Sequence, residues 1–182
     1  MHPPLTRHAL KPHPTTPCRV LDACSVELEL AADSELRLRY TLLGHMADLL
    51  VPPPRTPAAT DGLWAHTCCE AFFGLPGSDG YREFNFSPSG QWAIYDFAGY
   101  RDRVATPPLA PPAITTRRTN DALILEVRLA ACCLPGPGPQ QVGISAVVES
   151  VDGALSYWAL RHPGERPDFH HRDARTLTLP LP

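Results

Sequence analysis

The sequence predicts an all-β protein, a two-sheet antiparallel β-sandwich with Pro-rich loops and little helix. Several short runs alternate apolar and polar residues with a period of two, which is the pattern of strands that bury one face. Prolines account for 22 of the 182 residues and gather in stretches such as "VPPPRTP" from Val51 and "TPPLAPP" from Thr106. Proline at this density interrupts helices and central strands, so these stretches are expected to be loops.

The composition is that of one globular domain. Hydrophobic residues make up 43% of the chain and charged residues 19%, which is enough apolar material for a core. The formal net charge is -3, without a long run of like charge. Nucleic acid is therefore not expected as a partner, because phosphate binding needs a basic stripe. No window is long and apolar enough to span a bilayer, so a membrane is not an expected partner either.

Residues 1–17, "MHPPLTRHALKPHPTTP", are expected to be a flexible N-terminal arm, with the sandwich domain over residues 18–182. This arm lacks the apolar segment of a secretory signal, so the expected location is cytoplasmic. Free thiols are expected in that reducing compartment, since no two cysteines are spaced C-x-x-C. The six cysteines are Cys18, Cys24, Cys68, Cys69, Cys132 and Cys133.

The first strands are expected in "CSVELELAA" from Cys24 and "ELRLRYTL" from Glu35. Their strict alternation predicts a hairpin. One strand carries acids on its polar face and the other carries arginines, which predicts ion pairs between the strands. "HMADLLV" from His45 predicts a single helical turn, as does "AACCL" from Ala130.

The later strands follow at short intervals, bounded by turn residues such as Asn120-Asp121 and Asp152-Gly153. About nine or ten strands in total favour a sandwich. The later strands are expected over residues 67–73, 81–87, 91–97, 114–118, 123–129, 142–150 and 154–160, with a short one in "TLTLPL" from Thr176.

A candidate binding face follows from polar residues at strand positions. In "WAHTCCEAFFG", Glu70 lies on the face opposite Cys69, Ala71 and Phe73, which are expected in the core. In "YREFNFS", Glu83 and Asn85 lie opposite the Phe residues. Acids and an amide beside tryptophan suit a sugar-like ligand, because sugar rings stack on aromatic faces while hydroxyls bond to carboxylates and amides. The alternative is that the tryptophans fill the core.

No motif predicts catalysis or metal binding. The chain has no G-x-S-x-G, Walker A or H-E-x-x-H motif, so an enzyme is not expected. His170 and His171 are adjacent, which on a strand would point them to opposite faces. A carboxylate pair of Glu70 and Glu83 is the one arrangement that hydrolysis of a glycoside would require, and nothing in the sequence sets their separation.

Three stretches carry a resemblance to a known family: "DGLWAHTCCEAFFG", "YREFNFSPSGQWAIYDFAGYR" and "SYWALRHPGERPDFHHRDA". They resemble the bacterial DOMON-like proteins, which are related to family 9 carbohydrate-binding modules. The matching pattern is an acid at Asp61, a strand with Glu70, and a segment from Tyr81 to Gly90. The resemblance covers roughly residues 26–179 and implies a β-sandwich.

The resemblance also implies site residues for a non-catalytic domain that binds a carbohydrate or sugar-like ligand and needs no cofactor. In the carbohydrate modules two tryptophans clamp a terminal sugar, while acid, amide and Arg groups hold its hydroxyls. The corresponding residues here are Trp64 and Trp158 for the clamp, and Glu70 and Asn85 for the hydroxyls. Arg82 matches less well, because strand alternation puts it on the Phe face.

Two other functions are compatible with the sequence. Some DOMON domains bind haem through Met and His, and here Met46 would be the axial sulfur, with His162 or His170 opposite. The second is a protein-interaction domain that binds an unknown partner through an exposed sheet face and takes no small ligand.

Overall fold

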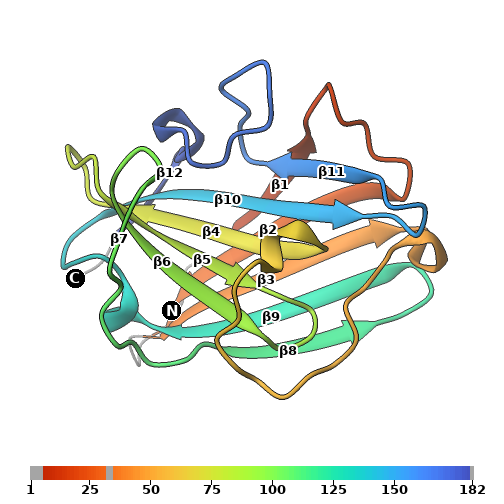
Figure 1. Cartoon of the computed structure of the whole chain (residues 1–182), viewed down its shortest axis with the longest axis horizontal. Coiled ribbons are helices and arrows are strands. Elements are labelled where there is room, and N and C mark those ends of the chain that lie inside the picture. Colours follow the sequence, from red (N-terminus) through yellow and green to blue (C-terminus); the bar gives the residue numbers. More distant parts are fainter. Residues whose placement is uncertain (1–5, 32–34, 181–182) are drawn as a thin grey trace.

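A computed structural model describes residues 6–31 and 35–180 and confirms an all-β sandwich. The described residues form twelve strands and four single-turn 3-10 helices (Figure 1). None of these helices is long and apolar enough to cross a membrane. The strands are β1 (Thr6–Pro12), β2 (Leu21–Leu30), β3 (Glu35–Gly44), β4 (Cys68–Gly74), β5 (Tyr81–Phe86), β6 (Trp92–Gly99), β7 (Asp102–Val104), β8 (Ala113–Arg118), β9 (Ala122–Ala130), β10 (Gln140–Glu149), β11 (Leu155–Ala159) and β12 (Leu177–Leu179).

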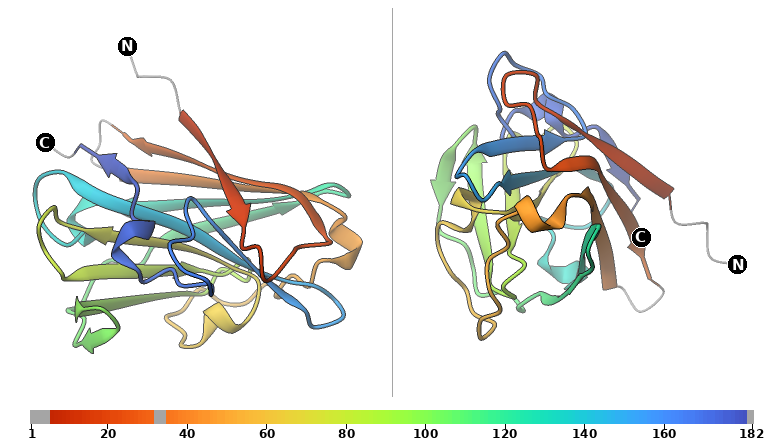
Figure 2. Two further views of the ribbon diagram at one scale, coloured as in Figure 1. Left: turned by 90° about the horizontal axis from the view of Figure 1, so that it is seen from above. Right: turned by 90° about the vertical axis from the view of Figure 1, so that its right-hand side faces the viewer.

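The strands form two layers, and neighbouring strands pair antiparallel throughout. We call β8, β9, β3, β2 and β1 the backing sheet, and β7, β6, β5, β4, β10 and β11 the cavity sheet. Strand β1 pairs with β2 and also with β11, so it joins the two sheets along one side of the sandwich (Figure 2). Strand β12 pairs with the first residues of β10.

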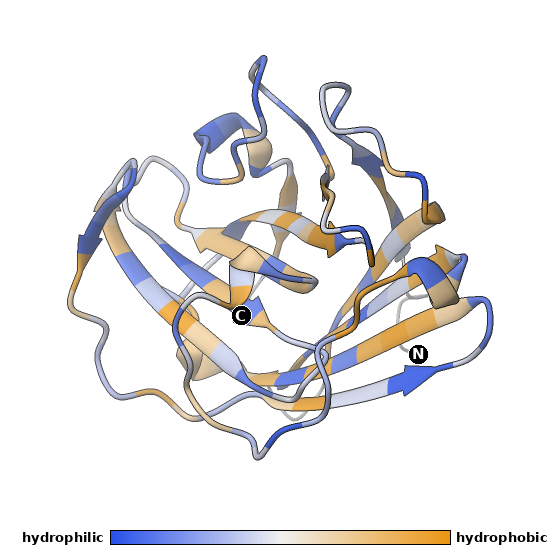
Figure 3. Ribbon diagram, turned by 45° about the vertical axis from the view of Figure 1, so that its right-hand side comes forward, coloured by the Kyte–Doolittle hydropathy of each residue, from blue (hydrophilic) through white to orange (hydrophobic). Residues whose placement is uncertain are grey.

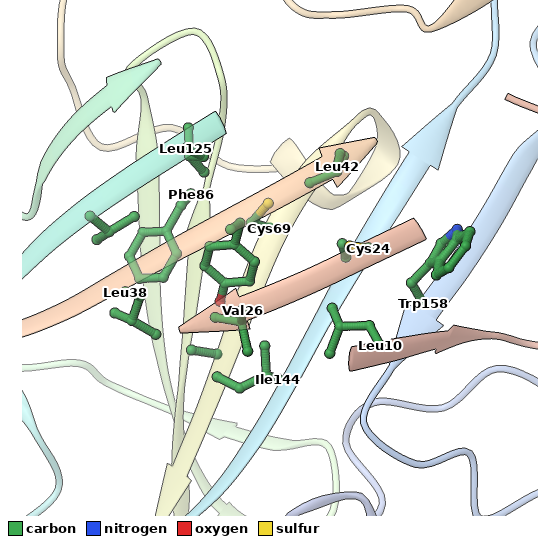
Figure 4. Packing of buried hydrophobic residues seen from close by; sticks show 14 of the residues in the cluster. Leu10, Cys24, Val26, Leu38, Leu42, Cys69, Phe86, Leu125, Ile144 and Trp158 are labelled. Atoms are coloured by element: carbon green, nitrogen blue, oxygen red, sulfur yellow. The ribbon is translucent and has the colours of Figure 1, made fainter. Parts of the chain in front are cut away.

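The core lies between the two sheets and follows from the alternation in the sequence. Strand β3 contributes Leu38, Tyr40 and Leu42, and β4 contributes Ala71 and Phe73 from the opposite side. Burying each large apolar side chain contributes roughly 1.5–3 kcal/mol. Figure 4 shows side chains from both sheets meeting in this space. The Tyr40 hydroxyl donates a 2.9 Å hydrogen bond to the Glu70 carbonyl oxygen, which ties β3 to β4 across the core.

The expected flexible arm needs correction. Residues 1–5 lie outside the described part, but Thr6–Pro12 form strand β1 within the sheet. The backbone N–H and C=O groups of this strand are hydrogen-bonded to β2 and β11. Among its residues, Leu10 alone is buried. One buried side chain gives almost no periodic signal, so the sequence pattern did not reveal the strand.

The predicted hairpin and helical turns are confirmed. Strands β2 and β3 pair with Glu27 opposite Arg39 and Glu29 opposite Arg37. The ion pairs of these residues join other strands, since Glu27 lies 3.7 Å from Arg7 of β1 and Arg39 lies 3.7 Å from Glu126 of β9. Such exposed pairs contribute at most about 1 kcal/mol each. The two expected turns are η1 (Met46–Asp48) and η3 (Ala131–Cys133).

All six cysteines are free. Cys24, Cys68 and Cys69 are fully buried, and burial raises the pKa of each thiol because it disfavours the thiolate. A thiol held protonated is a poor nucleophile, so these three side chains act as small apolar residues.

Candidate functional site

The outer face of the cavity sheet carries the polar residues that the alternation predicted. Glu70 of β4 lies directly between Asn85 of β5 and Ser145 of β10 in the strand register. Glu83 lies opposite Tyr95 of β6. The same alternation that turns Ala71 and Phe73 into the core therefore turns two acids and an amide outward.

A cavity of about 910 Å³ opens above this face. Its floor is the sheet, and its walls come from three segments that are far apart in the sequence: residues 61–64, the β6–β7 turn, and residues 166–170. Hydrophobic and hydrophilic residues alternate along the strands of the sandwich (Figure 3). The volume falls at the upper end of the range of small-molecule sites.

Aromatic side chains line much of the cavity. Trp64 stands on the short helix η2 (Leu63–Ala65), with 56% of the residue exposed. Tyr157 of β11 and Phe169 also line the cavity, and the centroids of their rings lie 5.9 Å apart. Tyr95 belongs to a separate apolar cluster of the outer face, against which Phe169 packs. The cavity thus offers flat apolar surfaces beside polar groups.

Two buried carboxyl groups form the acidic part of the floor. The Ser145 hydroxyl donates a 3.3 Å hydrogen bond to Glu70, and the Asn85 side-chain amide donates one of 2.6 Å to Glu83. Burial raises the pKa of Glu70 above its usual range, and the nearby Glu83 raises it further. Burial also raises the pKa of Glu83, against the opposing effects of the Asn85 hydrogen bond and of Arg101. A carboxyl that keeps its proton can donate a hydrogen bond as well as accept one.

Arginines occupy the rim near β6 and β7. Arg101 forms a 3.0 Å ion pair with Asp168, which ties the β6–β7 turn to the loop after β11. Arg103 lies over the Tyr95 ring, 4.0 Å from its centroid, and 3.7 Å from Asp61. The Tyr95 hydroxyl donates to the same Asp61 carboxylate at 2.7 Å. These contacts connect the acid that precedes Trp64 to the floor of the cavity.

His170 anchors the loop after β11. Its Nδ1 shares a 2.8 Å hydrogen bond with the Tyr81 hydroxyl, and its ring meets Phe72 and Phe97 edge-on. Burial, aided by the positive charge of Arg101, lowers the pKa of His170 to about 4, so the imidazole is neutral near pH 7. The loop is held by these contacts and by Arg101–Asp168, so the cavity wall is formed before any ligand arrives.

The structure brings part of the expected sugar site together. Trp64 and Glu70 both line the cavity. Asn85 is fully buried on the same face, where it holds Glu83 rather than reaching the cavity itself. It also accepts a weak 3.7 Å hydrogen bond from the Cys68 thiol. Asn85 is thus a positioning residue beneath the floor.

Trp158 is not part of the cavity, and its expected clamp role needs correction. It is 4% exposed and points into the core beside Leu10 (Figure 4). Its indole N–H donates to the Ser156 hydroxyl at 3.3 Å. Adjacent residues of a strand face opposite sides, so the residue of β11 that faces the cavity is Tyr157.

Arg82 lies on the opposite face of the sheet, as its position in the strand predicted. Its guanidinium makes two hydrogen bonds to the Asp96 carboxylate, of 2.6 and 2.8 Å. A third goes to the Cys133 carbonyl oxygen. This largely buried ion pair stabilises the edge of the sandwich near η3 and has no access to the cavity.

The residues considered for haem do not meet. Met46 is buried in the core between the sheets, whereas His170 lines the cavity on the outer face. The Nε2 of His162 is hydrogen-bonded at 2.8 Å to the Lys11 carbonyl oxygen, beside the turn after β1. Across residues 6–31 and 35–180, no cluster of three or more His, Cys, Asp or Glu side chains could hold a metal ion.

Several cavity residues had no recognisable signal in the sequence. Arg101 and Phe169 come from a turn and a loop, and Arg103 comes from the three-residue strand β7, so the placement of all three depends on tertiary contacts. The alternation of "ALSYWAL" did carry the signal for Tyr157, because it assigns Tyr157 and Trp158 to opposite faces.

Comparison with known proteins gives matches in structure alone. No protein-family model matches the chain, and no curated protein matches its sequence. A protein from Bacteroides uniformis ATCC 8492, described as a candidate carbohydrate-binding protein, is similar with a TM-score of 0.69 and 15% identity, over 93% of this chain and 83% of that one.

Two further similar structures belong to a carbohydrate-binding module of family 9 from Caldicellulosiruptor kristjanssonii. The complex with glucose has a TM-score of 0.57 and 9% identity, over 88% of this chain and 76% of that one. The complex with cellotriose has a TM-score of 0.57 and 8% identity, over 86% and 72%. At these identities the likeness shows the fold, which this chain shares with family 9 modules.

Proposed function

We propose that this protein is a non-catalytic carbohydrate-binding domain whose site is the cavity on the outer face of the cavity sheet. The observation that carries the proposal is the position of Trp64. Its large ring is exposed at the wall of a cavity whose floor holds the buried carboxyl groups of Glu70 and Glu83. An exposed indole beside buried hydrogen-bonding groups is an arrangement that suits a sugar ring.

Each part of the cavity has a task in this proposal. The apolar face of a pyranose stacks on Trp64, and the aromatic residues of the other walls cover the remaining C–H groups. The carboxyl groups of Glu70 and Glu83 bond to hydroxyls, with Asn85 holding Glu83 in place. Arg101 and Arg103 present N–H groups at the rim, where a hydroxyl can accept from them.

The similar structures support this ligand class. The family 9 module shares the fold and is described in complex with glucose and with cellotriose. The sequence resemblance to DOMON-like proteins in the segments around Trp64, Glu70 and Tyr81 supports the same assignment, and membership of that group is part of the proposal.

Isothermal titration calorimetry with glucose and cellotriose tests the proposal. We expect wild-type protein to bind one or both sugars, and Trp64→Ala to weaken the binding strongly. Val151→Ala is a matched control, since Val151 is also an exposed apolar residue and does not line the cavity. If wild type binds neither these sugars nor a wider panel, the proposal is wrong, and the protein-interaction function becomes the better account.

A further inference from the structure

A second hollow, of about 440 Å³, adjoins the cavity on the other side of residues 60–63. We call it the Pro-loop groove, because Pro52 and Pro53 form one of its sides. The groove and the cavity share two residues, Asp61 and Gly62. These two residues therefore form the ridge between the hollows.

The ridge is low and open. Gly62 has a positive φ of 76°, and a Cβ atom placed on it would meet nothing within 4 Å. The Asp61 side chain is 81% exposed. A ligand that occupies the cavity can thus continue over Gly62 without displacing a side chain.

The groove offers hydrogen-bonding groups with unused capacity. Gln91 Nε2 donates one N–H to the Thr60 hydroxyl at 2.8 Å and has a second N–H to offer. His66 Nδ1 is bound to Glu149 at 2.7 Å, which leaves Nε2 for a ligand. The Arg55 guanidinium forms no ion pair with any residue of the described part of the chain. Leu50 and Val51 add apolar surface beside these groups.

The sides of the groove are fixed by backbone hydrogen bonds. Arg55 N–H donates to the Ser89 carbonyl oxygen at 2.8 Å, and Thr60 N–H donates to that of Trp92, also at 2.8 Å. At the other end, the Thr67 hydroxyl donates to the Leu50 carbonyl oxygen at 2.6 Å. The Pro-rich loop is therefore held at both ends, and the groove is preformed.

We propose that the Pro-loop groove is a second subsite of the same binding site, which holds a further unit of an oligosaccharide whose first unit lies against Trp64. The inference rests on the proposed function, because the groove extends the cavity across the ridge at Gly62. A single sugar unit occupies only the cavity, whereas a longer glycan also bonds to Gln91, His66 and Arg55. The protein then selects oligosaccharides over monosaccharides.

Titration calorimetry with glucose and cellotriose, on wild type and two groove variants, tests the second subsite. Arg55→Ala removes an exposed side chain, so its fold should survive, and His66→Ala is an independent variant on the other side of the groove. We expect each to weaken cellotriose binding about fivefold to tenfold, as the loss of one hydrogen bond implies, with glucose binding unchanged. Arg161→Ala is the control, since Arg161 is also an exposed arginine and lines neither hollow.

The outcomes separate the two proposals. If wild type binds glucose and cellotriose equally well, or if both groove variants bind cellotriose like wild type, the second subsite is refuted while the cavity site stands. If wild type binds neither sugar, both proposals fail together. A thermal melt of each variant shows whether a loss of binding comes from unfolding.

Discussion

Trp64 and Trp158 are both expected in the sugar clamp from the resemblance, but replacing each by alanine should affect stability and sugar binding in opposite ways. Trp158 is 4% exposed in the core, and Trp64 is 56% exposed at the cavity. Trp158→Ala leaves a cavity between the sheets, which typically costs about 3–5 kcal/mol. For a chain of this length, each kcal/mol lowers the melting temperature by about 2–4 °C, so we expect a decrease of roughly 6–20 °C.

Trp64→Ala should leave the fold nearly unchanged. Less than half of the residue is buried, so its contribution to stability is about 1 kcal/mol or less. Sugar binding should instead weaken by about 1–3 kcal/mol, which is roughly a five- to 150-fold change, because the stacking surface is lost.

Thermal melts and sugar titrations on the same two variants provide the assay. The expected pattern is a large loss of stability without loss of affinity in folded Trp158→Ala, and the reverse in Trp64→Ala. If Trp64→Ala were the less stable variant, or if folded Trp158→Ala lost affinity as strongly as Trp64→Ala, the placement of the two residues would be refuted.

Further predictions concern pH, the buried ion pair and the thiols. The folded-state pKa of Glu70 is raised, so the contribution of this group to folding stability falls as the pH rises above the ordinary value of 4.5. Thermal melts should therefore show Glu70→Gln stabilising the protein more at pH 8 than at pH 4. The pKa of His170 is lowered to about 4, so its contribution to stability is present above pH 6.5 and is lost as the pH falls, by up to about 1.4 kcal/mol per pH unit. His170→Asn should reduce this dependence of the free energy of unfolding on pH, and an unchanged dependence would contradict the assignment. Arg82→Ala leaves the Asp96 carboxylate without its partner and should cost about 3–5 kcal/mol in denaturant unfolding, whereas the double variant with Asp96→Ala should cost less than the sum of the two single variants. A thiol count under denaturing, non-reducing conditions should give six, and any disulfide would lower it.

The sequence predicted most of the fold because the sandwich depends on local alternation. Strands such as β3 and β9 bury one face along most of their length, and this leaves alternating apolar residues in their sequences. Strands β1 and β7 were missed for the opposite reason, because they are held mainly by backbone hydrogen bonds to their neighbours. Such pairing depends on partners far away in the chain, so it leaves little trace in the local pattern.

The candidate site was predictable where it lies on strands and unpredictable where it lies on loops. Strand alternation assigned Glu70 and Asn85 to the correct face, because each lies an odd number of residues from the core phenylalanines of its own strand. The resemblance predicts Trp158 in the site, whereas strand alternation puts it opposite Tyr157, on the face that lies in the core. Arg101 reaches the cavity through its ion pair with Asp168, 67 residues later, and nothing local to either residue predicts that contact.

The central claim is that the cavity binds a sugar against Trp64, and a crystal structure grown with cellotriose tests it most directly. We expect one sugar ring stacked on the Trp64 indole, with a hydroxyl within hydrogen-bonding distance of the Glu70 or Glu83 carboxyl group. Cellotriose bound elsewhere on the protein, or an empty cavity at a saturating cellotriose concentration, would contradict the account.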